Sequence, residues 1–394
     1  MTRKSTVMAR KNTISRMVEI LLPMFGVWPG RPCVIIFRVF WVASAVFVEF
    51  CHYRYFVSHL SAENFFDLVD CLCSFLAHGK VITKLIMFWV NQRKLMETLA
   101  LMTDDWSDRA NNNDAGMHMM ARKAKTCNRI TNAIMILHTM TIVTYCTGMI
   151  IADVNVTDQT TEVPYINKVQ MPFRVDTQPM YRFVLIAEYV HMIISNWGAG
   201  IANAILLTLI LHVGGQMDIL QRWLSELASK DLGSERESIA RTASKIIQKH
   251  QRIIYFSENI ENLYTHIALF LFASNTILIC SLGFLIVTAI GSPDATEQIM
   301  KSLLFYTSTN LEAFLFCFAG EYLNNKSKKI GFAAYNCAWY NLKPKESRIL
   351  LFIILRSQRQ LTLTAGKMMD LTLESFASIM NASGSYLSVL LAMQ

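Results

Sequence analysis

The sequence predicts an all-α membrane protein with seven transmembrane helices, on the strength of three observations. The 394 residues are 53% hydrophobic and only 17% charged, whereas soluble domains average about 25% charged residues. Long apolar runs recur along the whole chain, and a helix needs about 20 mostly apolar residues to cross a hydrocarbon core. Lys and Arg gather in alternate connections between these runs. Burial in a membrane therefore explains how so few polar groups suffice to cover the molecule.

Seven apolar runs are predicted to cross the membrane as helices. They cover residues 33–50, 68–90, 130–152, 183–213, 263–290, 299–323 and 363–393. Another apolar run, 349–355, is too short to span a bilayer. It lies between Arg348 and Arg356, so we expect a cytoplasmic helix that leads into the last span.

The distribution of positive charge predicts the orientation of these spans. The N-terminal segment and the connections after the second, fourth and sixth spans are rich in Lys and Arg, whereas the other connections are poor in them. Because cytoplasmic loops carry the excess of positive charge, the N-terminus is predicted to be cytoplasmic and the C-terminus extracellular. A G-protein-coupled receptor has the opposite orientation, and the chain lacks that class's Asp/Glu-Arg-Tyr and Asn-Pro-x-x-Tyr motifs.

A single membrane domain is expected, because no repeat or Pro-rich linker divides the chain. Its predicted parts are a cytoplasmic N-terminal segment (1–32), four spans (33–213), a cytoplasmic extension (214–262), two spans (263–323), a cytoplasmic anchor helix (324–362) and the last helix (363–394). The net charge of +8 is dispersed among loops. Without an aromatic nucleic-acid-binding motif beside it, this charge indicates contact with anionic lipid and no nucleic-acid partner.

Enzyme and metal-site signatures are absent from the sequence. There is no Gly-rich phosphate loop, G-x-S-x-G elbow or H-E-x-x-H motif. The nine cysteines include no C-x-x-C pair, so we interpret them as small buried apolar residues. We therefore expect no enzyme, cofactor or metal. Asn155 starts an Asn-Val-Thr sequon in a predicted extracellular loop and is the expected glycosylation site.

Polar residues inside the spans point to function because they are costly there. Lys80 and Lys84 lie one turn apart, and the favoured interpretation is that both reach toward the cytoplasmic interface. Glu188 and His191, also one turn apart, either pair with each other or project into a ligand cavity. Glu312, midway along the sixth span, needs a partner that the sequence does not identify.

The last span carries a stripe of mostly small residues. Ala382, Ser385, Val389 and Met393 are spaced by three or four residues and so share one helical face. This face either packs inside one subunit or lines a narrow pore around a symmetry axis, closed by Val389 and Met393. Spacing alone favours packing.

Three segments of the carboxy-terminal third favour the pore interpretation of this face over packing inside one subunit. Residues 335–340 (YNCAWY), 361–367 (LTLTAGK) and 371–376 (LTLESF) resemble the best-shared segments of the insect odorant receptor family, in the same order and spacing. The resemblance implies a tetrameric, odorant-gated, non-selective cation channel in the plasma membrane of sensory neuron dendrites. Odour-specific subunits of this family assemble with a common co-receptor subunit, and the last helix lines the pore, with Val389 and Met393 at the gate.

The resemblance also implies where a small, volatile, apolar odorant binds, namely among spans two to six near the outer leaflet. Chosen by depth and chemistry, the candidate ligand residues are Phe75, His78, Tyr145, Met149, Glu188, His191, Phe305 and Tyr306. Trp339 and Tyr340 are the expected subunit anchors. Lys367, Asp370 and Glu374 are expected on one face of the last helix, as an ion pair or as an attractive ring for cations, with the ion pair preferred.

The end of the chain distinguishes between related subunit types. The co-receptor carries Thr-Tyr followed five residues later by Gln, whereas this chain has Ser385-Tyr386 and Ala392, which favours an odour-specific subunit. A gustatory receptor, the nearest rival, has Thr-Tyr and a later Gln-Phe, where this chain has Ala392-Met393. A secondary transporter would show related halves and broken helices, and neither is visible here.

Overall fold

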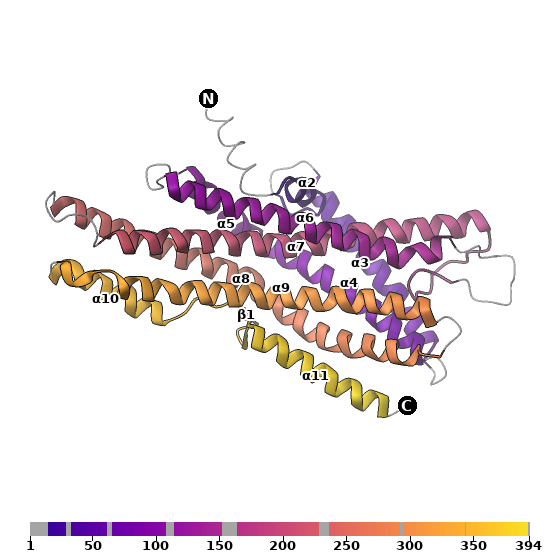
Figure 1. Ribbon diagram of the computed structural model, residues 1–394. Coiled ribbons are helices and arrows are strands. Elements are labelled where there is room, and N and C mark those ends of the chain that lie inside the picture. Colours follow the sequence, from indigo (N-terminus) through magenta and orange to yellow (C-terminus); the bar gives the residue numbers. More distant parts are fainter. Residues whose placement is uncertain are drawn as a thin grey trace.

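The computed structural model is a bundle of long helices (Figure 1). It describes residues 15–28, 33–60, 65–107, 114–151, 164–227, 236–291, 295–342 and 344–392. The helices are α2 (Arg16–Met24), α3 (Val34–Ser58), α4 (Phe65–Val90), α5 (Gln92–Ser107), α6 (Asp114–Ile151), α7 (Gln178–Leu227), α8 (Arg236–Thr288), α9 (Ala295–Asn336), the short 3₁₀ helix η2 (Trp339–Asn341), α10 (Pro344–Gln358) and α11 (Leu373–Ala392).

Six of these helices, α3, α4, α6, α7, α8 and α9, are long and apolar enough to cross a membrane. Each of the first six predicted spans coincides with one of them, running at most two residues past its ends, and the predicted α-helical class is confirmed. The last helix, α11, is not among the six candidates, because serine and asparagine residues interrupt its apolar run.

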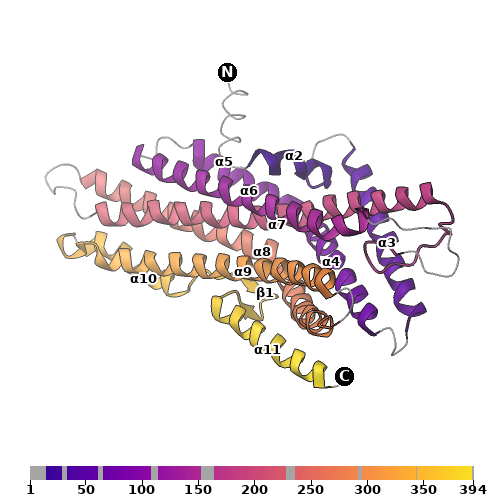
Figure 2. The same ribbon diagram turned by 45° about the vertical axis from the view of Figure 1, so that its right-hand side comes forward.

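Three helices extend well beyond the thickness of a bilayer. Helices α7, α8 and α9 have 50, 53 and 42 residues, and at about 1.5 Å per residue each exceeds the hydrocarbon core of about 30 Å. The ends at which α7 meets α8 and α9 meets α10 lie together at one end of the molecule (Figures 1 and 2). The extra length therefore builds a second bundle outside the apolar layer.

Helix α7 lies at the centre of the packing. Its residues from Gly198 to Met217 are buried without a break, and it contacts α4, α6, α8 and α9. A helix that is apolar all round is stable only when it is covered on every side. Helix α3, in contrast, exposes large apolar side chains along most of its length, including Ile35, Ile36, Val39 and Phe40. This exposed surface suits contact with lipid tails.

The segment before α11 differs from the prediction. The last span was expected from residue 363, but the structure contains a hairpin there, in which β1 (Thr364–Ala365) pairs with antiparallel β2 (Met369–Asp370). Leu361, Leu363 and Ala365 are buried while the intervening threonines are half-buried, which is the two-residue period of a strand and not the period of a helix. Helix α11 begins at Leu373.

The hairpin is fastened to α8. The backbone N–H of Gly366 donates a hydrogen bond to the carbonyl oxygen of Thr265 at 2.9 Å, and the backbone N–H of Thr364 donates to the Glu261 carboxylate at 2.8 Å. Gly366 and Lys367 both have positive φ, 60° and 59°, a turn conformation that favours glycine. Lys367 and Asp370 therefore lie in the hairpin and share no helical face with Glu374, contrary to expectation.

Candidate functional site

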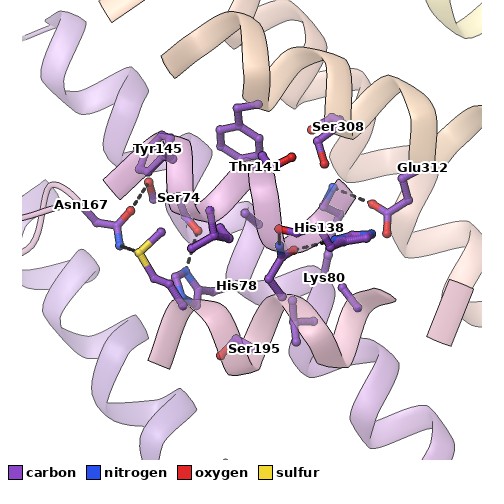
Figure 3. Close-up of a pocket in the computed structure, with 18 of the residues that line it drawn as sticks. Ser74, His78, Lys80, His138, Thr141, Tyr145, Asn167, Ser195, Ser308 and Glu312 are labelled. Atoms are coloured by element: carbon purple, nitrogen blue, oxygen red, sulfur yellow. Dashed lines mark hydrogen bonds and ion pairs between the residues drawn. The ribbon is translucent and has the colours of Figure 1, made fainter. Parts of the chain in front are cut away.

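A cavity of about 130 Å³ lies between α4, α6, α7 and α9 (Figure 3). Asn167, from the connection between α6 and α7, contributes to its outer wall. The apolar part of the lining comes from all four helices: Ala77, Val81, Ile142, Tyr145, Met192, Ala199 and Phe305. The polar part consists of Ser74, His78, Lys80, Lys84, His138, Thr141, Ser195, Asn196, Ser308, Thr309 and Glu312.

A buried charge cluster forms one end of this cavity. Glu312, on α9, accepts from Nζ of Lys80 at 3.0 Å and forms a second ion pair with Lys84. Lys80 also donates to Asn275 of α8 at 2.9 Å, and Lys84 to Asn203 of α7 at 3.1 Å. The cluster thus joins four helices through side chains that are each buried.

The expectation that both lysines reach toward the cytoplasmic interface is wrong. Lys80 and Lys84 are only 7% and 1% exposed, and both point to Glu312. They are the partners of Glu312 that the sequence did not reveal. A charge in an apolar layer is costly wherever it is alone. Pairing with a carboxylate at the same depth removes that cost without the side chain having to reach the interface.

The outer end of the cavity is held by Glu188. Its carboxylate accepts hydrogen bonds from the backbone N–H groups of Ile166 and Asn167, at 3.2 and 2.9 Å, and from the Asn167 side-chain amide at 2.9 Å. Asn167 Oδ1 in turn accepts from the Ser74 hydroxyl at 3.3 Å. Glu188 therefore positions the connection over the cavity without lining it.

Glu188 and His191 do not pair with each other within the described structure. The His191 ring stacks instead on His78, with centroids 5.7 Å apart and planes at 17°. His78 lines both the cavity and a neighbouring apolar groove of about 550 Å³ between α3 and α4. The ring pair forms part of the boundary between these two spaces.

The remaining ligand candidates fall in different places. Tyr145 and Phe305 line the cavity and also a more polar outer vestibule of about 350 Å³, which Met149 lines as well. Phe75 and His191 line the apolar groove. Tyr306 packs against the apolar cluster between α4 and α8 and lines none of these three spaces.

Helix α11 is packed on one side only. Leu387, Leu390 and Leu391 contact the apolar cluster formed by α4 and α8, and Ser383 is the one buried residue of the helix. The predicted stripe lies on another face: Val389 is 59% exposed, Ser385 is exposed and Ala382 is half-buried. Met393 lies outside the described residues, as does Asn155.

The predicted anchor residues stand at the surface. Trp339 and Tyr340 form the η2 turn between α9 and α10 and are 45% and 73% exposed. Within the residues that the structure describes, no group of three or more His, Cys, Asp or Glu side chains is placed to hold a metal ion.

Comparison with known proteins identifies the family. The family model described as 7tm Odorant receptor matches residues 64–384. The chain belongs to the insect odorant receptor family. Odorant receptor 10 of Aedes albopictus is 33% identical over 175 residues, which are 44% of this chain and 46% of that protein. Odorant receptor 13a of Drosophila melanogaster is 28% identical over 193 residues, 46% of each chain. The match thus spans about half the length of these relatives.

The fold of this odorant receptor is also that of a solved structure. The insect olfactory receptor OR5 of Machilis hrabei, determined alone and in complex with eugenol, superposes with a TM-score of 0.79. The two sequences are 16% identical, and the superposition covers 96% of this chain and 97% of the other. The resemblance noted in the three carboxy-terminal segments is therefore confirmed at the level of family and fold.

Sequence reasoning missed several residues that line the cavity of this odorant receptor. Lys80, Lys84 and Glu312 were noted as unusual but were not assigned to the cavity, and His138 and Asn196 were not singled out. The four-residue spacing of the lysines on one face of α4 was a usable signal. Asn167 offered none, because its role depends on how the connection folds back onto Glu188.

Proposed function

We propose that this odorant receptor is the odour-specific subunit of an odorant-gated, non-selective cation channel. It assembles with a co-receptor subunit into a heterotetramer in the plasma membrane of sensory neuron dendrites. A small volatile molecule binds in the cavity between α4, α6, α7 and α9. Binding opens a central pore that α11 lines together with the last helices of the other subunits.

The observation that carries this proposal is the one-sided packing of α11. The face bearing Ala382, Ser385 and Val389 has no partner comparable to the leucine face that packs on α4 and α8. A membrane helix with such a face needs neighbours outside its own subunit. The last helices of the other subunits around an axis supply them, and Val389, with Met393, then forms part of the apolar constriction.

Topology supports the same arrangement. With α11 as the seventh span and the basic connections on the cytoplasmic side, the N-terminus is cytoplasmic and the C-terminus extracellular. The second bundle, at the α7–α8 and α9–α10 ends, is then the cytoplasmic anchor. Large apolar side chains are exposed on its surface: Phe332, Tyr335, Trp339, Tyr340, Leu351, Phe352 and Leu355. Such a patch fits contact with other subunits.

The cavity supports the binding of a small ligand. Its volume is near that of the cavity of about 150 Å³ that holds benzene in another protein, and apolar side chains from all four helices line part of it. The related Machilis hrabei receptor was determined with eugenol, itself a small aromatic molecule. Ligand binding can open the pore only if it stabilises the open state more than the closed state.

Helix α9 is the element that links ligand to pore in this proposal. Phe305, Ser308, Thr309 and Glu312 of α9 line the cavity. Two residues beyond Glu312, the Phe314 ring meets Phe376 of α11 edge-on, with centroids 5.8 Å apart. A ligand that shifts α9 therefore moves the start of α11, and the gate residues lie further along that helix.

Whole-cell current tests the proposal directly. The chain is expressed alone and with an insect co-receptor, and a panel of volatile odorants is applied. Odorant-evoked cation current that requires both chains is the expected result. Current from this chain alone would refute the need for a partner. Absence of current with both chains at the cell surface, over a broad panel, would count against a channel function.

A further inference from the structure

We infer that the cavity of this receptor recognises a small monocarboxylate whose negatively charged end is bound by Lys80, Lys84 and Thr309. The inference rests on the proposed function, since it names the class of ligand taken by the same cavity. It starts from the make-up of the cluster at the end of the cavity, in which two lysine side chains share one carboxylate. Among the described residues, Glu312 is the only acidic side chain paired with either lysine.

Hydrogen-bond capacity points the same way. An ammonium group has three N–H donors, and the described partners of Lys80 and of Lys84 take two each. The Thr309 hydroxyl, also in the cavity wall, is buried and has no partner within the described structure. The Nδ2 group of Asn275, beside Lys80, is likewise buried without a partner. The ammonium and amide N–H groups left over at this end can only donate, and the Thr309 hydroxyl can donate as well as accept.

A carboxylate would pair with both the second lysine and the unpaired hydrogen-bond donors. It carries one negative charge and only accepts hydrogen bonds, with two oxygens that offer about four acceptor positions. Hydrogen bonds between charged groups are roughly twice as strong as neutral ones. The apolar lining residues Val81, Ile142 and Phe305 suit a short alkyl chain or an aromatic ring. The volume of about 130 Å³ limits the ligand to roughly the size of a six-carbon acid.

An ionised ligand also needs a polar route, and the outer vestibule offers one. It shares Tyr145, Asn167 and Phe305 with the cavity. Its wall carries charged side chains in two ion pairs, Lys168 with Asp67 at 2.8 Å and Lys301 with Glu297 at 2.6 Å. The carboxylate would thus approach along a hydrated wall before reaching the lysines.

Pairs of isomers, each an acid and an ester, isolate the effect of the ligand's charge on binding. Hexanoic acid and methyl pentanoate have the same atoms, as do butanoic acid and methyl propanoate, but only the acids are ionised at pH 7.5. Thermal unfolding of the purified full-length receptor in detergent, followed by tryptophan fluorescence, reports binding as a rise in midpoint. We expect the apparent dissociation constant of each acid to be about 10- to 100-fold lower than that of its isomer.

Lys80→Met is the decisive variant. It leaves Lys84 and Glu312 as a neutral one-to-one pair, so the fold keeps a paired carboxylate while the charge surplus disappears. We expect this variant to lose the preference for acids and to bind the esters as the wild type does. Thr309→Val removes a hydroxyl that makes no hydrogen bond to any residue that the structure describes, so it should fold normally and weaken acid binding severalfold. Lys329→Met, at an exposed position of α9, is the matched control. It should change neither the preference for acids nor the affinity for them.

Several outcomes would overturn the inference. One is equal binding of an acid and its isomeric ester by the wild type. Another is that neither acid raises the unfolding midpoint, and a third is that sodium chloride alone raises it as much as the acids do. The two proposals are separable in cells. Acid binding to the purified chain without acid-evoked current would count against the channel and leave the site standing. Ester-evoked current without any response to acids would count against the carboxylate site and leave the channel function standing.

Discussion

The Nε2 atom of His212, on α7, lies 3.0 Å from Oδ2 of Asp105, on α5. The other carboxylate oxygen of Asp105 faces two cations of α8, Arg252 at 2.9 Å and Lys249 at 3.7 Å. Asp105 is buried, with 6% of its side chain exposed, and α5 is not one of the six candidate spans. One carboxylate therefore ties together three helices of the second bundle.

Asp105→Asn is expected to destabilise the receptor by about 3 kcal/mol at neutral pH, because it leaves three basic side chains around a neutral amide. The measurement is thermal unfolding in detergent, with Asp104→Asn as the control, since Asp104 is the exposed neighbour on the same helix. An equal loss in both variants would show that the buried network contributes nothing specific.

The same contact predicts a pH dependence. Burial opposes ionisation of Asp105, but the hydrogen bond with His212 and the charges of His212, Lys249 and Arg252 outweigh burial and hold the pKa of this carboxyl below its ordinary value. A depressed pKa in the folded state contributes stability that is fully present above the unfolded value of about 3.9. It is lost as the pH falls through the folded value.

The difference in melting temperature between wild type and Asp105→Asn should therefore stay constant from pH 7 to pH 5 and shrink below about pH 4. A difference that shrinks already between pH 7 and pH 5 would show that a histidine, and not Asp105, controls the contact.

Glu188→Ala is expected to weaken odorant binding by releasing the connection that closes the outer end of the cavity. Three hydrogen bonds are lost, and we expect the half-maximal odorant concentration to rise about 10-fold, with faster decay of current after wash-out. Glu188→Gln keeps one acceptor oxygen and should show a smaller change. Arg174→Ala alters an exposed residue of the same connection and should be silent. A wild-type response in Glu188→Ala would refute the role of this residue in retaining ligand.

Gly320→Ala is expected to destabilise the junction between α9 and the segment before α11. A Cβ atom at position 320 would collide with the carbonyl oxygen of Leu371 and lie 2.8 Å from its Cβ, and overpacking of this kind costs about 1–3 kcal/mol. Gly384→Ala makes the same change in α11, where a Cβ meets none of the described residues within 4 Å. Thermal unfolding should show a loss for the first variant and none for the second, and similar losses for both would contradict the close approach.

Val389→Cys tests the pore face of α11. If this face lines the conduction path, an externally applied, positively charged methanethiosulfonate should block odorant-evoked current. Leu390→Cys is the matched control, because Leu390 packs against the apolar cluster of α4 and α8, and its modification should be slower by about tenfold or more. Equal rates at the two positions would place the pore elsewhere.

The membrane helices could be read from the sequence because each one satisfies a local rule of length and apolar content. The hairpin at residues 361–370 could also have been found, since Leu361, Leu363 and Ala365 alternate with threonines and Gly366 supplies the turn. The long apolar run that follows outweighed this two-residue period in the prediction. The error moved the start of the last helix and put Lys367 and Asp370 on a helix that they do not join.

The charge cluster of Lys80, Lys84 and Glu312 shows which contacts such local rules do not predict. Each of its members was visible as a costly residue in an apolar run, but Lys84 and Glu312 are 228 positions apart, and no periodicity relates them. Their pairing depends on how α4 and α9 are placed around α7. The same holds for Glu188, since His191, one helical turn away on α7, is not its partner in space.

That separation has a consequence for how the receptor is made. A lysine near the centre of a membrane helix costs about 2.5–3.5 kcal/mol during insertion at the translocon, and α4 carries two. At about 5–20 residues per second, a ribosome needs roughly 10–45 s to extend the chain from Lys84 to Glu312. Throughout that interval α4 is a poorly retained segment, and its counter-charge arrives only with α9. A chain that stops before α9 is made would therefore carry an α4 whose two lysines lack their carboxylate.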